Sequence, residues 1–409
     1  MANSTDRPVS DTQPRPISGI RLATAASGTR YKNRSDLTLI EIAPGATVEC
    51  LFTQNKFCAA PVTIARQHWA SGQSRYLIIN AGNANAGTGT PGEARCLEVC
   101  AAIAAAAGCS TLEVLPFSTG VIGQQLNAAA LAAPAPALVA ALKSDGWEAA
   151  AAAIMTTDTR AKLRSVEVRD GETRYGVTGI AKGSGMIKPD MATMLAYVAT
   201  DATVSAAVWR SIARRATELS FNRITVDGDT STNDALVLIA TGSADAPCVD
   251  SESHPLYARL AAAVEAVCLG LAHDIVRDGE GATKFITVEV GGGHSEQDCL
   301  RVAYAVAESP LVKTALFASD PNWGRILAAV GRAGAERLVI NEVDLAIGGL
   351  PIVQGGEPAP GYTEAEAAVI MKKPDIDIAI TIGRGACTAT VWTCDFSYEY
   401  VKINAEYRS

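Results

Sequence analysis

The sequence KGSGMIKPDMATML, residues 182–195, combines a shaped loop with the start of a buried element. Its two glycines allow a tight backbone conformation, and Pro189 disfavours the helical region at the residue before it. The first part of this stretch is therefore predicted to form a loop. The chain then becomes apolar, and residues 191–199 are predicted to begin a buried element. Thr193 lies where the loop and the buried element meet.

The hydroxyl of Thr193 has two interpretations. Threonine is a common helix cap at the start of an apolar run. It can also be a nucleophile if a base lies beside it, and the residue's own α-amine is such a base once the peptide bond between Ala192 and Thr193 is cut. The position alone leaves both interpretations open.

The size and charge of the chain narrow the class of protein. At 409 residues the chain is too long for one ordinary core, so two or more lobes are predicted. The formal net charge of −8 argues against nucleic acid or an anionic membrane as the main partner, because both require a basic surface. No uncharged apolar stretch reaches membrane length. We expect a soluble, cytoplasmic protein that acts on small molecules.

The cysteines and the first residues support this expectation. The ten cysteines are scattered without a Cys-x-x-Cys pair or a zinc-type Cys/His spacing, which is typical of a reduced compartment. We therefore expect neither disulfides nor a bound metal. Residues 1–16 are polar, contain prolines and lack an apolar core, so they are predicted to be a disordered tail and not a signal peptide.

A second motif with chemical potential follows the predicted strand at residues 112–117. The strand leads into Ser118-Thr119-Gly120, and a strand that ends in this way presents backbone N–H groups and hydroxyls at the edge of a sheet. An oxyanion hole is commonly built from such groups. A helix cap followed by a turn is the alternative.

The remaining pattern predicts helices and strands in alternation. Helices are expected at residues 93–107, 138–155, 204–219 and 256–274, and a helix broken at Pro310 at 301–318. Strands are expected at 38–42, 47–52, 76–80, 166–169, 175–180, 236–240, 285–290, 337–340, 345–347, 376–382 and 387–394. Gly291-Gly292-Gly293 is a candidate boundary, so we expect a catalytic α/β domain at 17–292 and a smaller α+β domain at 293–409.

Several kinds of site are excluded by the spacing of their residues. The acidic turn from Asp227 has its glycine second and Leu238 twelfth, whereas a calcium loop of the EF-hand type requires glycine sixth and glutamate twelfth. Its carboxylates are predicted to cap backbone N–H groups and to support the site. The order of Lys182 to Gly185 differs from a phosphate-binding loop. Neither a Gly-x-Ser-x-Gly elbow nor a His-Glu-x-x-His motif occurs.

The stretch 182–195 resembles the self-processing threonine of the ornithine acetyltransferase family, the arginine-biosynthesis bifunctional proteins. The similarity extends over residues 17–409 through further motifs: FTQN at 52 and AAPV at 59, NAGNAN at 80, STGVIG at 118, TTDT at 156, ITVDGDTSTND at 224, EGATK at 280 and DPNWGR at 320.

This resemblance implies a fold, a processing step and a reaction. The fold would be a layered sheet-and-helix sandwich of the N-terminal-nucleophile, amidase-like type, with a smaller C-terminal α+β domain. Cleavage before Thr193 would give chains 1–192 and 193–409, which would assemble as an α2β2 heterotetramer. The reaction would move an acetyl group from N2-acetylornithine to glutamate through an acetyl-threonine intermediate. The sequence leaves open whether acetyl-CoA also serves as an acetyl donor.

The resemblance also implies roles for individual residues. Thr119 and Gly120 would form the oxyanion hole, Thr193 would be the nucleophile, and the substrate contacts would come from Thr156, Lys182, Thr193, Glu280, Asn404 and Ser409. These roles agree with the chemistry of the side chains. Lysine can bind a substrate carboxylate, and glutamate can bind the ammonium of ornithine.

The mechanism agrees with the absence of a histidine motif. An α-amine has an ordinary pKa of about 7.7 to 8.0, so part of it is an uncharged base at neutral pH. Two alternatives remain open at this point. An aminopeptidase or amidase on the same scaffold would use water as its acceptor, and a binding protein would not be cleaved.

Overall fold

The computed structural model describes residues 10–171, 173–188 and 194–407. Contacts within the chain group its residues into two compact units, each with its own sheets. Unit 1 consists of residues up to 183, 189–222 and 230–275. Unit 2 consists of residues 184–188, 223–229 and 276–409. Ala192, Thr193 and Ser409, which the sequence analysis assigns to the cleavage and substrate sites, lie outside the described residues.

Unit 1 contains two β-sheets. The four-stranded sheet has the order β1-β2-β4-β5, with β1 at Ile20–Ala25, β2 at Leu37–Ile42, β4 at Tyr76–Asn83 and β5 at Val114–Val121. The five-stranded sheet has the order β3-β9-β8-β7-β6, with β3 at Thr47–Phe52, β6 at Lys162–Asp170, β7 at Thr173–Lys182, β8 at Leu195–Thr200 and β9 at Ala235–Ala240. The pairs β4–β5 and β8–β9 are parallel.

The two sheets of unit 1 share one apolar core. Strand β2 is buried on both faces, so that Ile40 contributes to this core and Leu39 to a second cluster on the other side of the sheet. Phe117 of β5 and Tyr197 of β8 meet edge to face in the shared core, with their ring centroids 5.4 Å apart. Helices α1 (Ala60–Ala70) and α5 (Trp147–Ala153) add side chains to it.

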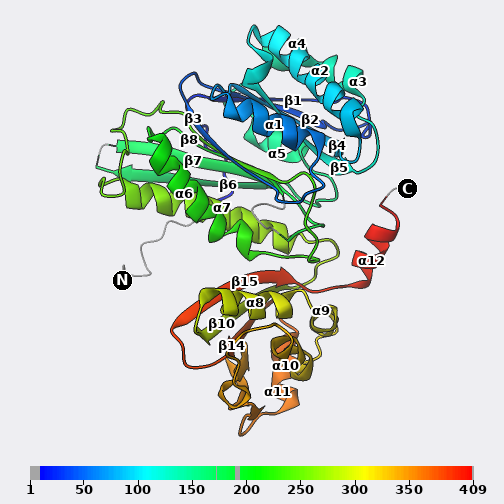
Figure 1. The fold of residues 1–409 in the computed structure, drawn as a ribbon, viewed down its shortest axis with the longest axis vertical. Coiled ribbons are helices and arrows are strands. Elements are labelled where there is room, and N and C mark those ends of the chain that lie inside the picture. Colours follow the sequence, from blue (N-terminus) through cyan, green and yellow to red (C-terminus); the bar gives the residue numbers. More distant parts are fainter. Residues whose placement is uncertain (1–9, 172, 189–193, 408–409) are drawn as a thin grey trace. The chain divides into compact units, whose positions relative to one another are not determined.

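Helices cover the outer faces of both sheets (Figure 1). On the four-stranded sheet these are α2 (Gly89–Ala107), α3 (Ala128–Ala132) and α4 (Ala135–Ala140), and on the five-stranded sheet α6 (Ala206–Glu218) and α7 (Tyr257–Arg277). The approach of α7 is close, because a Cβ on Gly179 of β7 would lie 3.0 Å from the Val267 side chain. Unit 1 is therefore a helix–sheet–sheet–helix sandwich, and the α/β class predicted from the sequence is confirmed.

Unit 2 is built around one mixed sheet of six strands. Its order is β13-β12-β11-β14-β10-β15, with β10 at Phe285–Gly293, β11 at Asp344–Ile347, β12 at Leu350–Gln354, β13 at Glu357–Pro358, β14 at Asp375–Thr381 and β15 at Cys387–Cys394. Its core includes side chains of α8 (Glu296–Ala307), α9 (Pro310–Phe317), α10 (Trp323–Gly331) and α11 (Glu364–Met371). The chain ends in α12 (Tyr398–Ala405), and short 3-10 helices lie at Thr111–Glu113, Phe221–Arg223 and Ile340–Glu342.

The boundary between the units differs from the one expected at 292/293. Strand β10 pairs with β14 from Phe285 to Gly291 and with β15 on its other side, so it belongs to the C-terminal sheet. Unit 2 accordingly begins at Val276. It also takes in residues 184–188 and 223–229, two short segments that sequence order alone would assign to the first domain.

The expected disordered tail is ordered in its last part. The backbone N–H and C=O of Asp11 pair with Ser165 at 2.9 and 2.8 Å, and the Ser10 hydroxyl donates to the Ala266 carbonyl. The physical reason is that β6 is an edge strand, whose backbone groups would otherwise lack partners in the sheet. Residues 10–16 are thus an exception to the prediction, and residues 1–9 lie outside the described range.

Two predicted elements are different in the structure. The single helix expected at 138–155 is replaced by α4 and α5, because Lys143 pairs with Leu22 of β1 and Gly146 packs against the backbone of Leu22. The strand expected at 337–340 is not formed, and the 3-10 helix Ile340–Glu342 leads into β11 instead.

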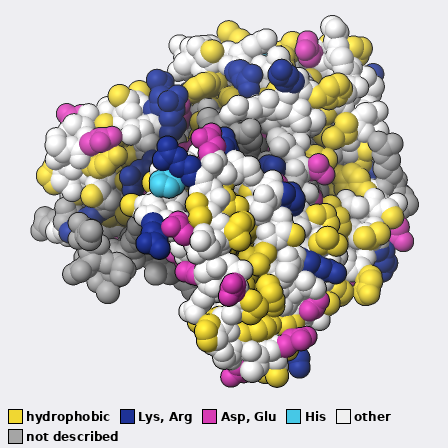
Figure 2. Space-filling view, turned by 60° about the horizontal axis from the view of Figure 1, so that its bottom comes forward, with side chains coloured by type: hydrophobic (Ala, Val, Ile, Leu, Met, Phe, Trp, Pro, Cys, Tyr) yellow, Lys and Arg dark blue, Asp and Glu magenta, His cyan; other side chains and the backbone are white. Residues whose placement is uncertain are grey.

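The described helices contain none that is long and apolar enough to cross a membrane. In the space-filling view, basic and acidic side chains are interspersed on the visible face (Figure 2).

Candidate active site

The end of β5 forms the first part of the candidate site. Gly120 pairs with Gly82 of β4 and has a φ of +130°, a conformation that side chains rarely adopt. A Cβ on Gly120 would lie 2.2 Å from the carbonyl carbon of Gly82 and 2.6 Å from the nitrogen of Asn83. Only glycine therefore fits next to Thr119, which is itself buried.

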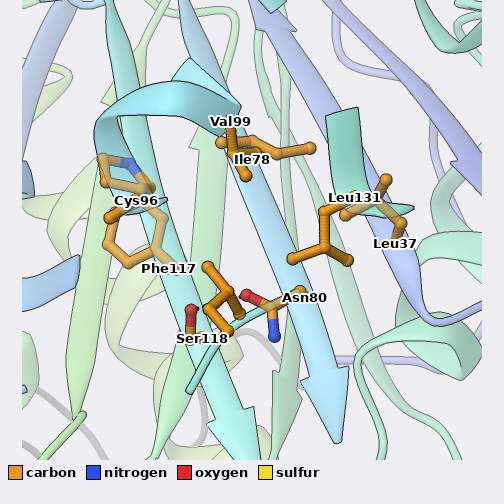
Figure 3. A pocket seen from close by; sticks show the side chains of 10 residues that line it. Leu37, Ile78, Asn80, Cys96, Val99, Phe117, Ser118 and Leu131 are labelled. Atoms are coloured by element: carbon orange, nitrogen blue, oxygen red, sulfur yellow. Dashed lines mark hydrogen bonds between the residues drawn. The ribbon is translucent and has the colours of Figure 1, made fainter. Parts of the chain in front are cut away.

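A network of buried amides holds the ends of β4 and β5 together. The Ser118 hydroxyl donates to Oδ1 of Asn80 at 2.5 Å, and the two side chains face each other at one end of a small, mostly apolar pocket (Figure 3). Nδ2 of Asn233, which precedes β9, donates to the carbonyls of Ala84 and Ser118 at 2.6 and 3.0 Å. Asn233 thus links the five-stranded sheet to the backbone just before Thr119.

Lys182 brings a positive charge to the same place. It is the last residue of β7, and its Nζ donates to Oγ1 of Thr119 at 3.2 Å. The two residues come from different sheets and are separated by a long stretch of chain. The structure therefore brings together the predicted substrate residue Lys182 and the predicted oxyanion residue Thr119.

Asp158 holds the backbone at Thr156 next to the backbone at Gly183, the residue that follows Lys182. Its carboxylate accepts hydrogen bonds from the backbone N–H of Thr156 at 2.9 Å, from that of Gly183 at 2.7 Å and from Nζ of Lys162 at 2.6 Å. The side chains of Asp158 and Lys162 are both 0% exposed. Burial alone would raise the pKa of Asp158, but the ammonium groups of Lys162 and Lys182, together with the hydrogen bonds from Lys162 and the Gly183 N–H, lower it to about 2.

The start of β9 lies beside the end of β7 and the start of β8, at the same end of the five-stranded sheet. Lys182, Leu195 and Ala235 are register partners across β7, β8 and β9. The N–H of Ala235 donates to the carbonyl of Met194, the residue that follows Thr193 in the chain. Asp234, the residue before Ala235, is buried at the same edge.

Two predicted substrate residues meet in unit 2. Nδ2 of Asn404 on α12 donates to Oε2 of Glu280 at 2.8 Å, and the N–H of Glu280 donates to the carbonyl of Ser184. Gly185 packs directly on this carboxylate, because a Cβ there would lie 2.4 Å from Oε2 of Glu280. The other described site residues, Thr119, Gly120, Thr156 and Lys182, belong to unit 1.

The acidic turn at Asp227 caps backbone groups, as predicted. Its two carboxylate oxygens accept the N–H groups of Met186 and Ile187 at 2.6 and 2.9 Å. Met186 has a φ of +55°, and these bonds stabilise its unusual conformation. Among the described residues there is no group of three or more His, Cys, Asp or Glu side chains that could hold a metal ion.

Sequence reasoning missed several residues that shape the site, namely Asp158, Lys162, Asn233 and Asp234. A lysine at the start of a strand, four residues after an aspartate, was the available signal for the buried pair. Asn233 and Asp234 carried no local signal beyond the acidic turn. The resulting arrangement presents the Thr119 hydroxyl and the Lys182 ammonium beside the Gly120 backbone, which is suited to stabilising a negative charge on oxygen.

We expect Gly120→Ala to lower the rate of acyl transfer by about 10²- to 10³-fold, because the methyl group displaces the backbone of an oxyanion donor. The measurement is kcat, with circular dichroism to check the fold. Gly123→Ala is the matched control, since Gly123 also has a positive φ but a Cβ there meets nothing within 4 Å. Equal activities of the two variants would contradict the prediction.

We expect Asp158→Asn to destabilise the protein by about 3–5 kcal/mol, because it leaves the buried Lys162 without its counter-charge. The pKa of Asp158 is lower than its ordinary value, so its stabilisation is present above about pH 4 and is lost as the pH falls through about 2. Chemical unfolding at neutral and acidic pH measures both effects.

The control for this prediction is Asp145→Asn, which removes a carboxylate from the exposed pair with Lys143. Because the Asp145 side chain is 70% exposed, its loss should change the free energy of unfolding by less than about 1 kcal/mol. A similar stability for both variants would show that the buried pair does not stabilise the fold.

Comparison with known proteins identifies the family. The sequence model of the ArgJ family matches residues 21–409. The arginine biosynthesis bifunctional protein ArgJ of Psychrobacter arcticus is 55% identical over 394 residues, which are 96% of this chain and 97% of the relative. The protein of the same name from Methylococcus capsulatus is 51% identical over 408 residues and 100% of both chains.

Solved structures include a crystal structure of the arginine biosynthesis bifunctional protein ArgJ from Bacillus halodurans. It is 40% identical, covers 52% of this chain and 98% of its own, and has a TM-score of 0.49. The ornithine acetyltransferase of Mycobacterium tuberculosis, solved in complex with ornithine, is 35% identical, covers 42% and 93%, and has a TM-score of 0.41. On the strength of the family match and of relatives above 50% identity over nearly their whole length, this chain belongs to the ArgJ family.

Proposed function

We propose that this protein is a glutamate N-acetyltransferase of arginine biosynthesis, which moves an acetyl group from N2-acetylornithine to glutamate. The observation that carries the proposal is the contact between Lys182 and Thr119 beside the glycine backbone of residue 120. It provides a charge for a substrate carboxylate next to donors for an oxyanion. The proposal is also supported by membership of the ArgJ family, whose relatives are named for arginine biosynthesis.

Thr193 is the nucleophile in this proposal. Its hydroxyl oxygen attacks the acetyl carbonyl of acetylornithine, and its own α-amine, freed by cleavage after Ala192, accepts the hydroxyl proton. The Thr119 hydroxyl and the Gly120 N–H stabilise the tetrahedral oxyanion. Ornithine leaves as an amine after taking that proton, and an acetyl ester remains on Thr193.

The second half of the reaction reverses the first with a different amine. The uncharged amine of glutamate attacks the acetyl ester, the same oxyanion donors act again, and the Thr193 oxygen recovers a proton as N-acetylglutamate leaves. Two amines using one site in turn give ping-pong kinetics. The aminopeptidase and binding-protein alternatives are not favoured by membership of the ArgJ family.

Each unit carries some of the residues proposed to contact substrate. In unit 1, Lys182 binds the substrate carboxylate and Thr156 lies on the loop that Asp158 fixes. In unit 2, the buried carboxylate of Glu280 is oriented by Asn404 and has the charge to bind an ammonium of ornithine. Ser409 completes the proposed set of substrate contacts.

The proposal extends to assembly and location. Chains 1–192 and 193–409 remain associated and form an α2β2 heterotetramer in the cytoplasm. Association of the cleaved chains is supported by the antiparallel pairing of β8 with β7 and of β9 with β3, which joins strands from both sides of the cleavage point in one sheet.

We expect Thr193→Ala to abolish acetyl transfer and to leave the chain uncut, because the variant lacks the hydroxyl needed for both steps. A denaturing gel should show two fragments for the wild type and one full-length band for the variant. Thr193→Ser, which keeps a hydroxyl, is the control and should retain cleavage. An active enzyme that stays in one piece would refute the mechanism.

We also propose that the enzyme forms N-acetylglutamate from acetyl-CoA and glutamate, a second activity that agrees with the word bifunctional in the name of its relatives. The measurement is the steady-state rate with acetyl-CoA in the absence of acetylornithine. Thr193→Ala is the control for a shared nucleophile and should lose this activity too. A rate equal to the uncatalysed background would restrict the enzyme to the ornithine-dependent reaction.

A further inference from the structure

Two buried carboxyl groups act on Lys182. One is Asp158, whose charge is already matched by the buried ammonium of Lys162 at 2.6 Å. The other is Asp234, at the start of β9, which interacts electrostatically with Lys182. The charge available at Lys182 therefore depends on whether Asp234 is ionised.

The surroundings of Asp234 are unfavourable for a charge. The residue is 4% exposed, and its Oδ2 is buried without a hydrogen-bond partner among the described residues. Ser231 hydrogen bonds to the carboxyl group. An ionised carboxylate with one buried oxygen unpaired would lose its hydration without compensation, whereas a neutral acid avoids most of this cost.

The position of Asp234 is fixed by its backbone. Its carbonyl accepts the N–H of Thr53 at 3.0 Å, and the N–H of the next residue, Ala235, donates to Met194. Lys182 on β7 and the thiol of Cys58 before α1 are titratable groups that interact electrostatically with the carboxyl. Arg66 of α1 in turn interacts electrostatically with Cys58.

Counting charges shows what each state of Asp234 does. If both aspartates were ionised, two carboxylates and two ammonium groups would cancel, and this edge of the sheet would not attract an anion. If Asp234 is neutral, the pair of Asp158 and Lys162 cancels and the ammonium of Lys182 keeps one net positive charge. Only the second state is suited to binding a substrate carboxylate.

We propose that Asp234 is held as a neutral carboxylic acid and thereby reserves the charge of Lys182 for the carboxylate of the substrate. Asp234 is then a positioning residue that determines affinity for anionic substrates, and it acts through Lys182. This inference rests on the proposed function in one respect, namely that Lys182 binds a substrate carboxylate.

The proposal has a consequence for pH dependence. Burial raises the pKa of Asp234 well above its ordinary value, although the hydrogen bonds of Ser231 and the charge of Lys182 oppose the shift. As the pH rises through this pKa, Asp234 loses its proton and its new charge neutralises Lys182. The KM for glutamate should then rise, while at lower pH it should be constant.

The first test observes the proton directly. Infrared difference spectra of the cleaved, ligand-free enzyme, wild type against Asp234→Asn, should show that the variant loses a carbonyl band of a protonated acid at neutral pH. Glu41→Gln is the matched control, because Arg21 lowers the pKa of Glu41 against the effect of burial, so this substitution should leave the band intact. A band that survives in Asp234→Asn would overturn the proposal.

The second test is kinetic and uses the wild type as its own reference. KM and kcat for glutamate are measured from about pH 5 to about pH 10 in the wild type and in Asp234→Asn, which has a neutral amide of the same shape. The wild-type KM should rise at least several-fold at alkaline pH, and the variant should lack this rise. The same alkaline rise in both proteins would overturn the role of Asp234.

The two tests separate this inference from the proposed function. The infrared band reports the state of Asp234 whether or not the enzyme transfers acetyl groups, so a missing band refutes the inference alone. A protein without any transfer between acetylornithine and glutamate refutes the proposed function, and the band still decides whether Asp234 is neutral. If Asp234→Asn does not fold, the infrared spectrum of the wild type remains decisive, since the absence of any protonated-acid band at neutral pH would refute the proposal.

Discussion

The buried ion pair of Asp158 and Lys162 is the interaction on which the geometry of the site depends. One carboxylate accepts the N–H of Thr156, the N–H of Gly183 and the ammonium of Lys162. A charge in this position is tolerated only because its counter-ion is buried beside it. The pair therefore fixes the backbone at Thr156 and at Gly183, the residue that follows Lys182.

The second constraint is the close approach of two backbones at Gly82 and Gly120. The absence of a Cβ lets the ends of β4 and β5 lie against each other, and Asn233 then ties this edge to the five-stranded sheet through two carbonyls. The donors at Thr119 and Gly120 on one sheet and the ammonium of Lys182 on the other are consequently held close to each other. A site assembled from the ends of strands is rigid because the sheets behind it share one core.

Much of the architecture could be predicted from local pattern. Short runs of β-type residues identified most strands, and Pro310 marked the break between α8 and α9. The errors have physical causes. The helix expected at 138–155 is interrupted because Lys143 and Gly146 pack on Leu22 of β1, and residues 10–16 are ordered because an edge strand offers them partners. Such contacts join distant parts of the chain and leave no periodic signal in either part.

The motifs around residues 118–120 and 182–195 were enough to assign the family and to name Thr119, Gly120 and Lys182, because those residue types recur in a specific order. Only the tertiary structure showed that Lys182 touches Thr119, that Asp158 is paired with Lys162, and that one oxygen of Asp234 is buried without a partner. The reason is that burial and charge compensation are properties of packed strands from separate segments. A linear sequence records which groups are present but not which of them share a dry interior.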